Sequence, residues 1–236
     1  MKITLFTSDN NRHKYLAKLL STVCDEFYLV QERKTTKPKK IKIGKHLKKY
    51  FKNVSKAQNK FFNSNQNFKN KRTLKINYGE LNSLSINKFK EFFESDLYIV
   101  FGSSYIKGRL LNFLIKKKTI NIHAGVSPYY KGTDCNFWAL YDNNPHLVGV
   151  TIHMLSKGLD SGPILYHAMS KLKKNSYEYT MSTIKSAFVS VVKKIKNKSI
   201  YNIKPLKQNQ SKQIRYSKKI EFDDIRAKEF ISRKID

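Results

Sequence analysis

Three polar side chains in this sequence could carry out chemistry together: Asn121, His123 and Asp160. Asn121 and His123 lie in a short apolar run at 119–123, and a strand there would place both on one face because side chains alternate. Asp160 follows His123 by 37 residues, in the glycine-flanked run 157–162, which predicts a loop between two further strand-like segments. An amide, an imidazole and a carboxylate at one end of a sheet are groups that an acyl-transfer site could use.

Strands and helices alternate along residues 1–197, and this order predicts the scaffold that must position these groups. Short apolar runs predict strands at 2–7, 26–30, 97–101, 118–122, 148–155 and 164–169. Helical spacing predicts helices at 11–23, 86–93 and 134–141. Two more helices are predicted, one that begins directly after the turn at 102–104 and one that begins after Asn175, which forms a capping box with Glu178. We therefore predict an α/β fold with a doubly wound, mostly parallel sheet, in which the last two strands are an antiparallel addition.

The net charge of +30 is high enough to suggest a polyanionic partner. Lysine supplies 40 of the 47 basic residues and the seven arginines are scattered, so a bias in composition explains the charge equally well. From Arg33 to Lys75 there are sixteen basic residues and no acidic one. Within the stretch 33–80, a spaced apolar set predicts a Lys-rich helical insertion, and its members are Leu47, Tyr50, Phe51, Val54, Phe61 and Phe62.

Other features of the chain narrow the class of protein. No run reaches the roughly 18 to 20 apolar residues of a membrane span, and the first residues are too few for the apolar region of a signal peptide, so we expect a cytoplasmic protein. Cys24 and Cys135 lack the spacing of metal ligands, and we expect no metal. The chain becomes polar beyond Tyr201. We therefore expect one catalytic domain at 1–205 and an appendage outside the core at 206–236.

Four short motifs follow one another along the chain: Asn121-Ile-His123, the loop from Ser127-Pro128 to Gly132, Gly149-Val-Thr151, and Leu159-Asp160-Ser-Gly162. In their order and spacing they resemble the formyltransferase family that uses 10-formyltetrahydrofolate, over about residues 97–170 and more loosely over the first 30. The resemblance implies a Rossmann-type sheet and transfer of a formyl group from 10-formyltetrahydrofolate to a primary amine.

The resemblance also assigns roles to individual residues. Asn121, His123 and Asp160 match the catalytic Asn, His and Asp of the family. The segments that wrap the folate match Gly102, Ser103, Ser104, Tyr105 and Ile106, together with Ser156, Lys157, Gly158 and Leu159. The loop near the acceptor matches Ser127, Tyr129, Tyr130 and Lys131, and we add Asn10 and Arg12, which follow the first strand, as acceptor-binding residues.

Two differences from other members of this family narrow the choice of formyl acceptor. The run after the first strand, 8–13, lacks the glycine-rich phosphate turn of the glycinamide ribonucleotide enzyme, and the tail after Tyr201 is shorter than the second domain of the tRNA enzyme. Both departures favour a small amine, with a nucleotide-linked amino sugar as the first hypothesis. Three alternatives stay open: methionyl-tRNA formylation with 33–75 as a tRNA clamp, hydrolysis of the folate itself, and a basic nucleic-acid-binding protein on the same scaffold. A homodimer is left open as well.

The chemistry of formyl transfer gives each group of the triad an expected part. The Asn121 N–H and a protonated His123 would donate to the formyl oxygen as it gains negative charge. Asp160 would keep His123 oriented and charged. We interpret His153 and His167 as structural histidines and Trp138 as a core residue.

Overall fold

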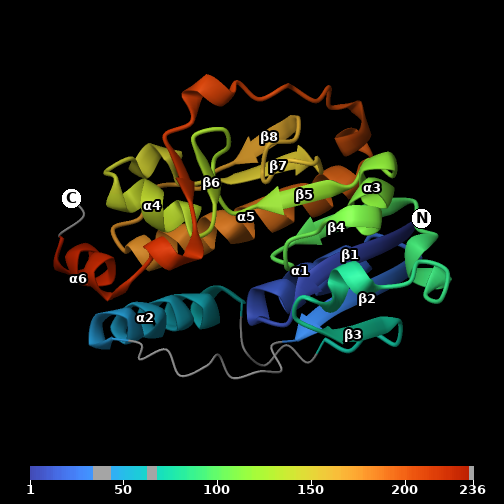
Figure 1. Cartoon of the computed structure of the whole chain (residues 1–236), viewed down its shortest axis with the longest axis horizontal. Helices are drawn as coiled ribbons and strands as arrows, with labels where there is room; N and C mark the ends of the chain where they lie inside the picture. Colours follow the sequence, from blue (N-terminus) through green and yellow to red (C-terminus); the bar gives the residue numbers. More distant parts are fainter. Residues whose placement is uncertain (34–43, 63–67, 234–236) are drawn as a thin grey trace.

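The computed structural model describes residues 1–33, 44–62 and 68–233, and within them seven strands form one sheet with the order β3-β2-β1-β4-β5-β7-β8 (Figure 1). These strands are β1 (Lys2–Ser8), β2 (Glu26–Arg33), β3 (Thr73–Asn77), β4 (Leu97–Phe101), β5 (Ile120–His123), β7 (Val150–Met154) and β8 (Ile164–Ala168). All neighbours from β3 to β5 pair in parallel, whereas β7 is antiparallel to both β5 and β8. The predicted α/β fold, with its mostly parallel sheet and antiparallel addition, is confirmed.

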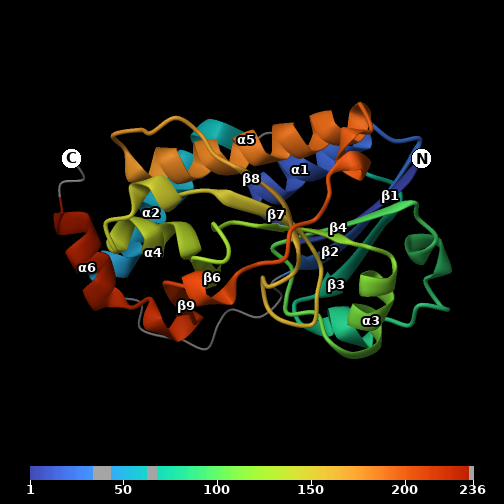
Figure 2. The ribbon, with the colours of Figure 1, turned by 90° about the horizontal axis from the view of Figure 1, so that it is seen from above.

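Helices cover both faces of this sheet. The α-helices of the described residues are α1 (Asn11–Ser21), α2 (Lys45–Phe62), α3 (Gly108–Lys116), α4 (Cys135–Tyr141), α5 (Ser176–Lys196) and α6 (Asp224–Ser232), of which α4 and α6 pack outside the sheet. Short 3-10 helices lie at Glu80–Ser83, Lys90–Phe93, Pro145–Leu147, Ser199–Asn202, Gln210–Lys212 and Lys219–Glu221. In Figure 2, α1 and α5 lie on one side of the strands and α3 on the other.

Each face of the sheet has its own apolar core. Leu16 of α1 and Phe188 of α5 belong to a buried cluster with Ile99 of β4 on one face. Leu110 and Leu114 of α3 pack in a second cluster on the opposite face. The strands read as nearly continuous apolar runs because both faces are covered, as is typical of parallel sheets.

Two predicted helix starts can be checked in detail. The Asn175 side chain accepts a hydrogen bond from the Glu178 backbone N–H at 3.0 Å, so the cap of α5 forms as expected. Helix α3 begins at Gly108, so Ile106 precedes it, contrary to the prediction of a helix directly after the turn at 102–104. The Ser104 backbone N–H donates to the buried carboxylate of Glu32 at 2.6 Å, which holds this segment in a non-helical path.

The basic stretch 33–80 contributes to both the helical layer and the sheet. α2 packs its Ala57 and Phe62 into the core, while Phe51 of the predicted apolar set stays 46% exposed. β3 then extends the sheet as its edge strand, which the prediction of a helical insertion did not include. Residues 34–43 and 63–67 lie outside the described part of the chain.

The C-terminal segment packs in a third apolar cluster. Phe222, Ala227 and Phe230 are buried there with Phe137 and Trp138 of α4. A short strand, β9 (Arg215–Ser217), pairs in parallel with β6 (Tyr130–Gly132). The expectation that 206–236 stays outside the core is therefore wrong for these residues, because widely spaced aromatic side chains bury themselves even in a polar stretch. The boundary of the catalytic domain near residue 205 stays a prediction.

Two kinds of feature are missing from the described residues. Among them, no helix has the length and apolar character needed to cross a bilayer. In the same part of the chain, no three His, Cys, Asp or Glu side chains cluster as metal ligands would.

We predict that Phe222→Ala lowers the free energy of unfolding by about 3 kcal/mol, because truncating a buried aromatic residue removes apolar contacts and leaves a cavity. The Phe222 ring lies 4.2 Å, between centroids, from Phe137 and 4.8 Å from Tyr50. The measurement is chemical denaturation of the full chain. The matched control is Ile220→Ala nearby, since Ile220 is 86% exposed. Equal effects of the two substitutions would contradict a buried tail.

Candidate active site

Asn121, His123 and Asp160 meet at the junction of β5 with the loop between β7 and β8. His123 Nδ1 lies 3.3 Å from Asp160 Oδ1, and Asn121 Nδ2 lies 3.5 Å from the same oxygen. His123 and Asp160 are 7% and 8% exposed. The three side chains therefore converge on one buried carboxylate, and the two from β5 share a face as alternation requires.

The backbone around Asp160 is tightly constrained. Asp160 has a φ of +48°, in the left-handed region that few residues other than glycine adopt. Gly162, two residues on, lies so close to β7 that a Cβ atom there would sit 1.7 Å from the Met154 carbonyl oxygen. The loop can thus turn back onto the sheet only with glycine at 162, and this turn directs the Asp160 side chain to β5.

His153 also belongs to this group of polar side chains. It lies on β7 directly opposite Asn121, and its Nε2 is 3.0 Å from Asn121 Nδ2. Its Nδ1 is 2.9 Å from the Met154 carbonyl oxygen, so Nδ1 carries the hydrogen and Nε2 accepts from the amide. The sequence alone predicts His153 only as a structural histidine. The signal that could have placed it in the site was the antiparallel register between the strands carrying Asn121 and His153.

The hydrogen bonds of Asn121 decide what its amide can offer to a substrate. One N–H donates to His153 at 3.0 Å, whereas the contact with Asp160 at 3.5 Å is long for a hydrogen bond. The second N–H is therefore the one available to a substrate oxygen.

The protonation of His123 differs from the expectation of a charged imidazole. Burial lowers the pKa of His123 below its ordinary value of 6.5, and Asp160, which favours the proton, does not outweigh burial. Its Nε2 lies 3.1 Å from the Tyr130 carbonyl oxygen, so both ring nitrogens face oxygen atoms. At neutral pH the resting ring is therefore mostly neutral. The Asp160 carboxylate and the Tyr130 carbonyl oxygen would each accept a hydrogen bond if both ring nitrogens carried hydrogen.

Asp160 itself is held as a carboxylate. Burial raises its pKa, but His123, His153 and the backbone N–H of Gly132 together bring the pKa of Asp160 below the ordinary 3.8. The Gly132 N–H donates to Asp160 Oδ2 at 3.1 Å. The site thus keeps one negative charge in a buried place because the Gly132 N–H donates to it and His123 lies against it.

The first segment predicted to wrap the folate lies beside Asn121. Val100 pairs with Asn121, and the turn at Gly102 begins two residues later. Gly102 has a φ of +61°, and a Cβ atom there would come within 2.8 Å of His13 Nε2. Along this segment Ser103 donates to the Ser104 carbonyl oxygen at 3.1 Å, Tyr105 is 57% exposed and Ile106 is buried.

The second segment predicted to wrap the folate lies on the loop that carries Asp160. The Ser156 hydroxyl donates to the Gly158 carbonyl oxygen at 3.2 Å, which closes the loop on itself. Lys157 and Leu159 are exposed, Leu159 by 38%. Leu159 and Tyr105 are thus apolar side chains that these segments leave open to a ligand.

The loop predicted to contact the acceptor is more buried than expected. Ser127 is fully buried, and the Tyr130 ring is 1% exposed, with its hydroxyl accepting from Asn144 at 2.8 Å. The expectation that these two side chains contact an acceptor conflicts with this burial, and the part of Tyr130 that faces the site is its carbonyl oxygen. Lys131 is 5% exposed, donates to Gln210, and has a pKa lowered by burial. Tyr129 is partly exposed.

Asn10 and Arg12 lie at the start of α1. Asn10 is exposed and its side chain makes no capping hydrogen bond. Arg12 Nη1 donates to Gln58 of α2 at 3.3 Å, so its guanidinium sits between the two helices. Neither residue makes a hydrogen bond to the triad.

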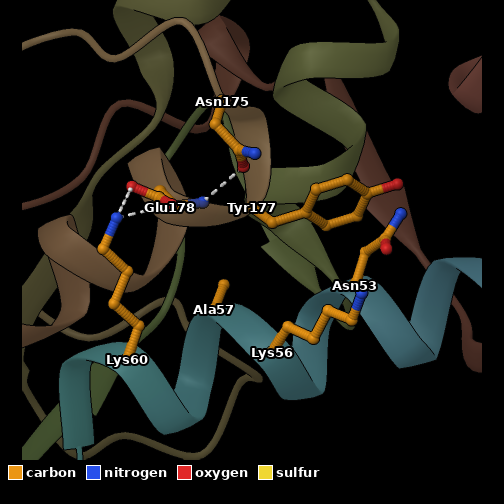
Figure 3. Close-up of a pocket in the computed structure, with 7 residues that line it drawn as sticks. All are labelled: Asn53, Lys56, Ala57, Lys60, Asn175, Tyr177 and Glu178. Atoms are coloured by element: carbon orange, nitrogen blue, oxygen red, sulfur yellow. Dashed lines mark hydrogen bonds and ion pairs between the residues drawn. The ribbon is translucent and has the colours of Figure 1, made fainter.

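A cavity in the described residues lies away from these groups. It measures about 290 Å³ and lies between α2 and the start of α5, where Lys60 and Glu178 pair at 2.8 Å (Figure 3). A second cavity of about 220 Å³ adjoins it and shares Asn53, Asn175 and Tyr177. Neither is lined by Asn121, His123 or Asp160, so neither is the predicted active site.

Comparisons with known proteins match this chain to formyltransferases, which agrees with the geometry of the site. Residues 33–195 match the family described as formyl transferase. The methionyl-tRNA formyltransferase of Prochlorococcus marinus is 24% identical over 147 residues, 59% of this chain and 44% of that protein. The GDP-perosamine N-formyltransferase of Brucella melitensis is 30% identical over 95 residues, 40% of this chain and 36% of that protein. The chain thus spans less than half the length of either curated relative.

Among solved structures, the fold matches that of the formyltransferase PseJ from Anoxybacillus kamchatkensis, with a TM-score of 0.54. The two are 21% identical, and the match covers 94% of this chain and 87% of the other. That structure was determined in complex with UDP-4,6-dideoxy-4-formamido-L-AltNAc and tetrahydrofolate. At this level of identity the likeness shows a shared fold.

We predict that His123 makes the folded state less stable in acid. The pKa of His123 is lower in the folded state, so the unfolded chain binds more protons as pH falls through 6.5. The stability that neutral His123 contributes to the folded state is therefore complete above that pH and is lost as pH falls. Between about pH 7.5 and 5, above the range in which Asp160 titrates, His123→Gln should therefore lose less stability than the unmodified chain.

Thermal unfolding across this range measures the effect. His146→Gln is the matched control, because His146 is exposed. An identical pH slope for His123→Gln and the unmodified chain would show that His123 titrates alike in the folded and unfolded states.

Proposed function

Because this chain belongs to the formyl transferase family, we propose that it transfers a formyl group from 10-formyltetrahydrofolate to the amine of a small acceptor. The observation that carries this proposal is the convergence of Asn121, His123 and Asp160, with both β5 side chains within 3.5 Å of one carboxylate oxygen. These groups are the ones that attack on a formyl carbon requires: donors for an oxygen that becomes negative, and a route for a proton.

The folate supplies the one-carbon unit: as the amine nitrogen bonds to the formyl carbon, the bond from that carbon to the folate nitrogen breaks, and a proton passes from the amine to the folate nitrogen. The residues present fit such a group. The Gly102 turn starts next to Asn121, and Tyr105 and Leu159 leave apolar surface open on the two segments predicted to hold a flat heterocycle.

The residues of the chain would then act on charge and protons. The second N–H of Asn121 donates to the formyl oxygen as it turns anionic. This new negative charge favours the proton on His123, whose ring nitrogens already face Asp160 and the Tyr130 carbonyl oxygen. His123 thus gains its charge by taking up the proton that the attacking amine loses, and it gives this proton to the folate nitrogen as the bond to the formyl carbon breaks. While charged it stabilises the oxygen, and Asp160 holds the ring in place.

For the acceptor we propose a nucleotide-linked amino sugar. PseJ was solved with a UDP-linked formamido sugar, and the Brucella relative acts on GDP-perosamine by name. Among the residues predicted to bind it, Asn10 is exposed and Tyr129 is partly exposed, so both keep surface open to a sugar.

We predict that Asn121→Ala lowers kcat by about 100- to 1000-fold, the usual cost of removing a donor aimed at a developing oxyanion. Asp160→Asn lowers kcat as well, because it removes the charge that orients His123 and favours its proton. The assay measures release of tetrahydrofolate from 10-formyltetrahydrofolate in the presence of a panel of nucleotide-linked amino sugars. Asn87→Ala, at an exposed position, is the matched control. Wild-type rates in both active-site variants would refute the proposal.

A second candidate acceptor is methionyl-tRNA, which one observation favours. α2 carries six exposed lysines and no acidic residue, and Lys48, Lys52 and Lys56 form one row at four-residue spacing. Such a row suits a phosphate backbone, and the Prochlorococcus relative is a methionyl-tRNA formyltransferase.

If this row binds tRNA, replacing Lys48, Lys52 and Lys56 by Gln reduces the slope of log affinity against log salt by about 0.7 to 0.9 for each phosphate that the protein no longer neutralises. Binding of initiator and elongator tRNA at several salt concentrations measures it. The control replaces Lys107 and Lys116, exposed residues at the two ends of α3. Equal, weak binding of both tRNAs would leave the small amine as the acceptor.

A further inference from the structure

Gln208, in the C-terminal segment, fastens the loop that carries Asp160. Its side chain is 5% exposed, and its Nε2 donates to two backbone carbonyl oxygens, that of Asp160 at 2.9 Å and that of Gly162 at 2.7 Å. Both amide hydrogens are thus used on the same short turn, and neither is spent within the tail itself.

The turn is one that needs outside support. Asp160 adopts a φ of +48°, and such a conformation persists in a residue other than glycine only where its surroundings fix it. The two bonds from Gln208 hold the carbonyl groups on either side of the turn, so they fix the peptide planes from which the Asp160 side chain extends.

The tail is itself anchored on both sides of Gln208. Before it, Leu206 and Ile164 exchange backbone hydrogen bonds of 2.8 Å in both directions. After it, Gln210 accepts from Lys131, and β9 pairs with β6. Gly132 of β6 donates to the Asp160 carboxylate at 3.1 Å. The segment 206–217 therefore supports Asp160 twice, through Gln208 at the backbone and through β6 at the carboxylate.

We propose that Gln208 is a positioning residue that holds the Asp160 carboxylate against His123. The proposal rests on the proposed formyl transfer and extends it to a segment whose sequence predicts only an appendage. Gln208 touches no reacting atom. Its effect passes through Asp160, so loss of its two hydrogen bonds lets the carboxylate move away from the imidazole.

The test uses Gln208→Met, which keeps the length of the side chain and removes both donors. We expect kcat to fall by about 10- to 100-fold, since a shift of about 1 Å in a catalytic group costs this much, while KM for the folate changes less than about threefold. Gln213→Met, an exposed glutamine in the same tail, should leave both constants unchanged.

The deciding measurement repeats Gln208→Met in an Asp160→Asn background, by single-turnover kinetics. If Gln208 acts through Asp160, the second substitution lowers the remaining rate little, because residues that act as a unit are not additive. An equal fall in both backgrounds, or no fall in the wild-type background, overturns the proposal. Should Gln208→Met not fold, Gln208→Asn keeps the amide on a shorter side chain, and the same comparison applies.

Failure of the proposed formyl transfer and failure of the proposed role of Gln208 give different experimental results. A wild-type chain that transfers no formyl group, in an assay where a known formyltransferase is active, removes the proposed function. A wild-type chain that is active and sensitive to Asp160→Asn, but indifferent to Gln208→Met, removes only the role of Gln208.

Discussion

A buried carboxylate must be surrounded by hydrogen-bond donors, and this requirement at Asp160 organises the whole site. Removing a charge from water costs several kcal/mol unless neighbours replace the lost hydration. Here the replacements come from His123 on β5 and from the Gly132 backbone on β6, while Gln208 fixes the peptide that carries the carboxylate. Elements far apart in sequence are thus tied to one charge, and the three that meet there are the antiparallel edge of the sheet, the short strand β6 and the tail.

Glu32, at the end of β2, is a second buried carboxylate that is surrounded by hydrogen-bond donors. Its carboxylate is 1% exposed and accepts from the Ser104 backbone and hydroxyl at 2.6 Å and from the Gly79 backbone at 2.9 Å. It fixes the turn after β4, which lies next to Asn121. Two buried carboxylates therefore hold the two loops that flank β5. A sheet of apolar strands would otherwise leave such loops without a fixed path.

What the sequence predicted well depends on local pattern. Alternation placed Asn121 and His123 on one face, glycines marked the Asp160 turn, and apolar runs marked the strands, because each of these signals lies within a few residues. The partners of His153 and Gln208 were not predictable in this way. They depend on strand register and on contacts between residues 32 to 48 positions apart, which no local period encodes. The burial of Phe222 was missed for the same reason.

The charge of His123 shows why a pairing that is correct in geometry can still mislead about protonation. An adjacent carboxylate was expected to keep the imidazole charged, yet burial lowers the pKa of His123. Asp160 does raise the pKa of His123, but burial lowers it more, and the nearby His153 and Lys131 lower it further. Desolvation then prevails in the resting state. During the reaction a second negative charge arises on the formyl oxygen, which the single N–H of Asn121 compensates only in part. This charge also attracts a proton to the His123 ring, and the buried setting that removes the proton at rest strengthens that attraction.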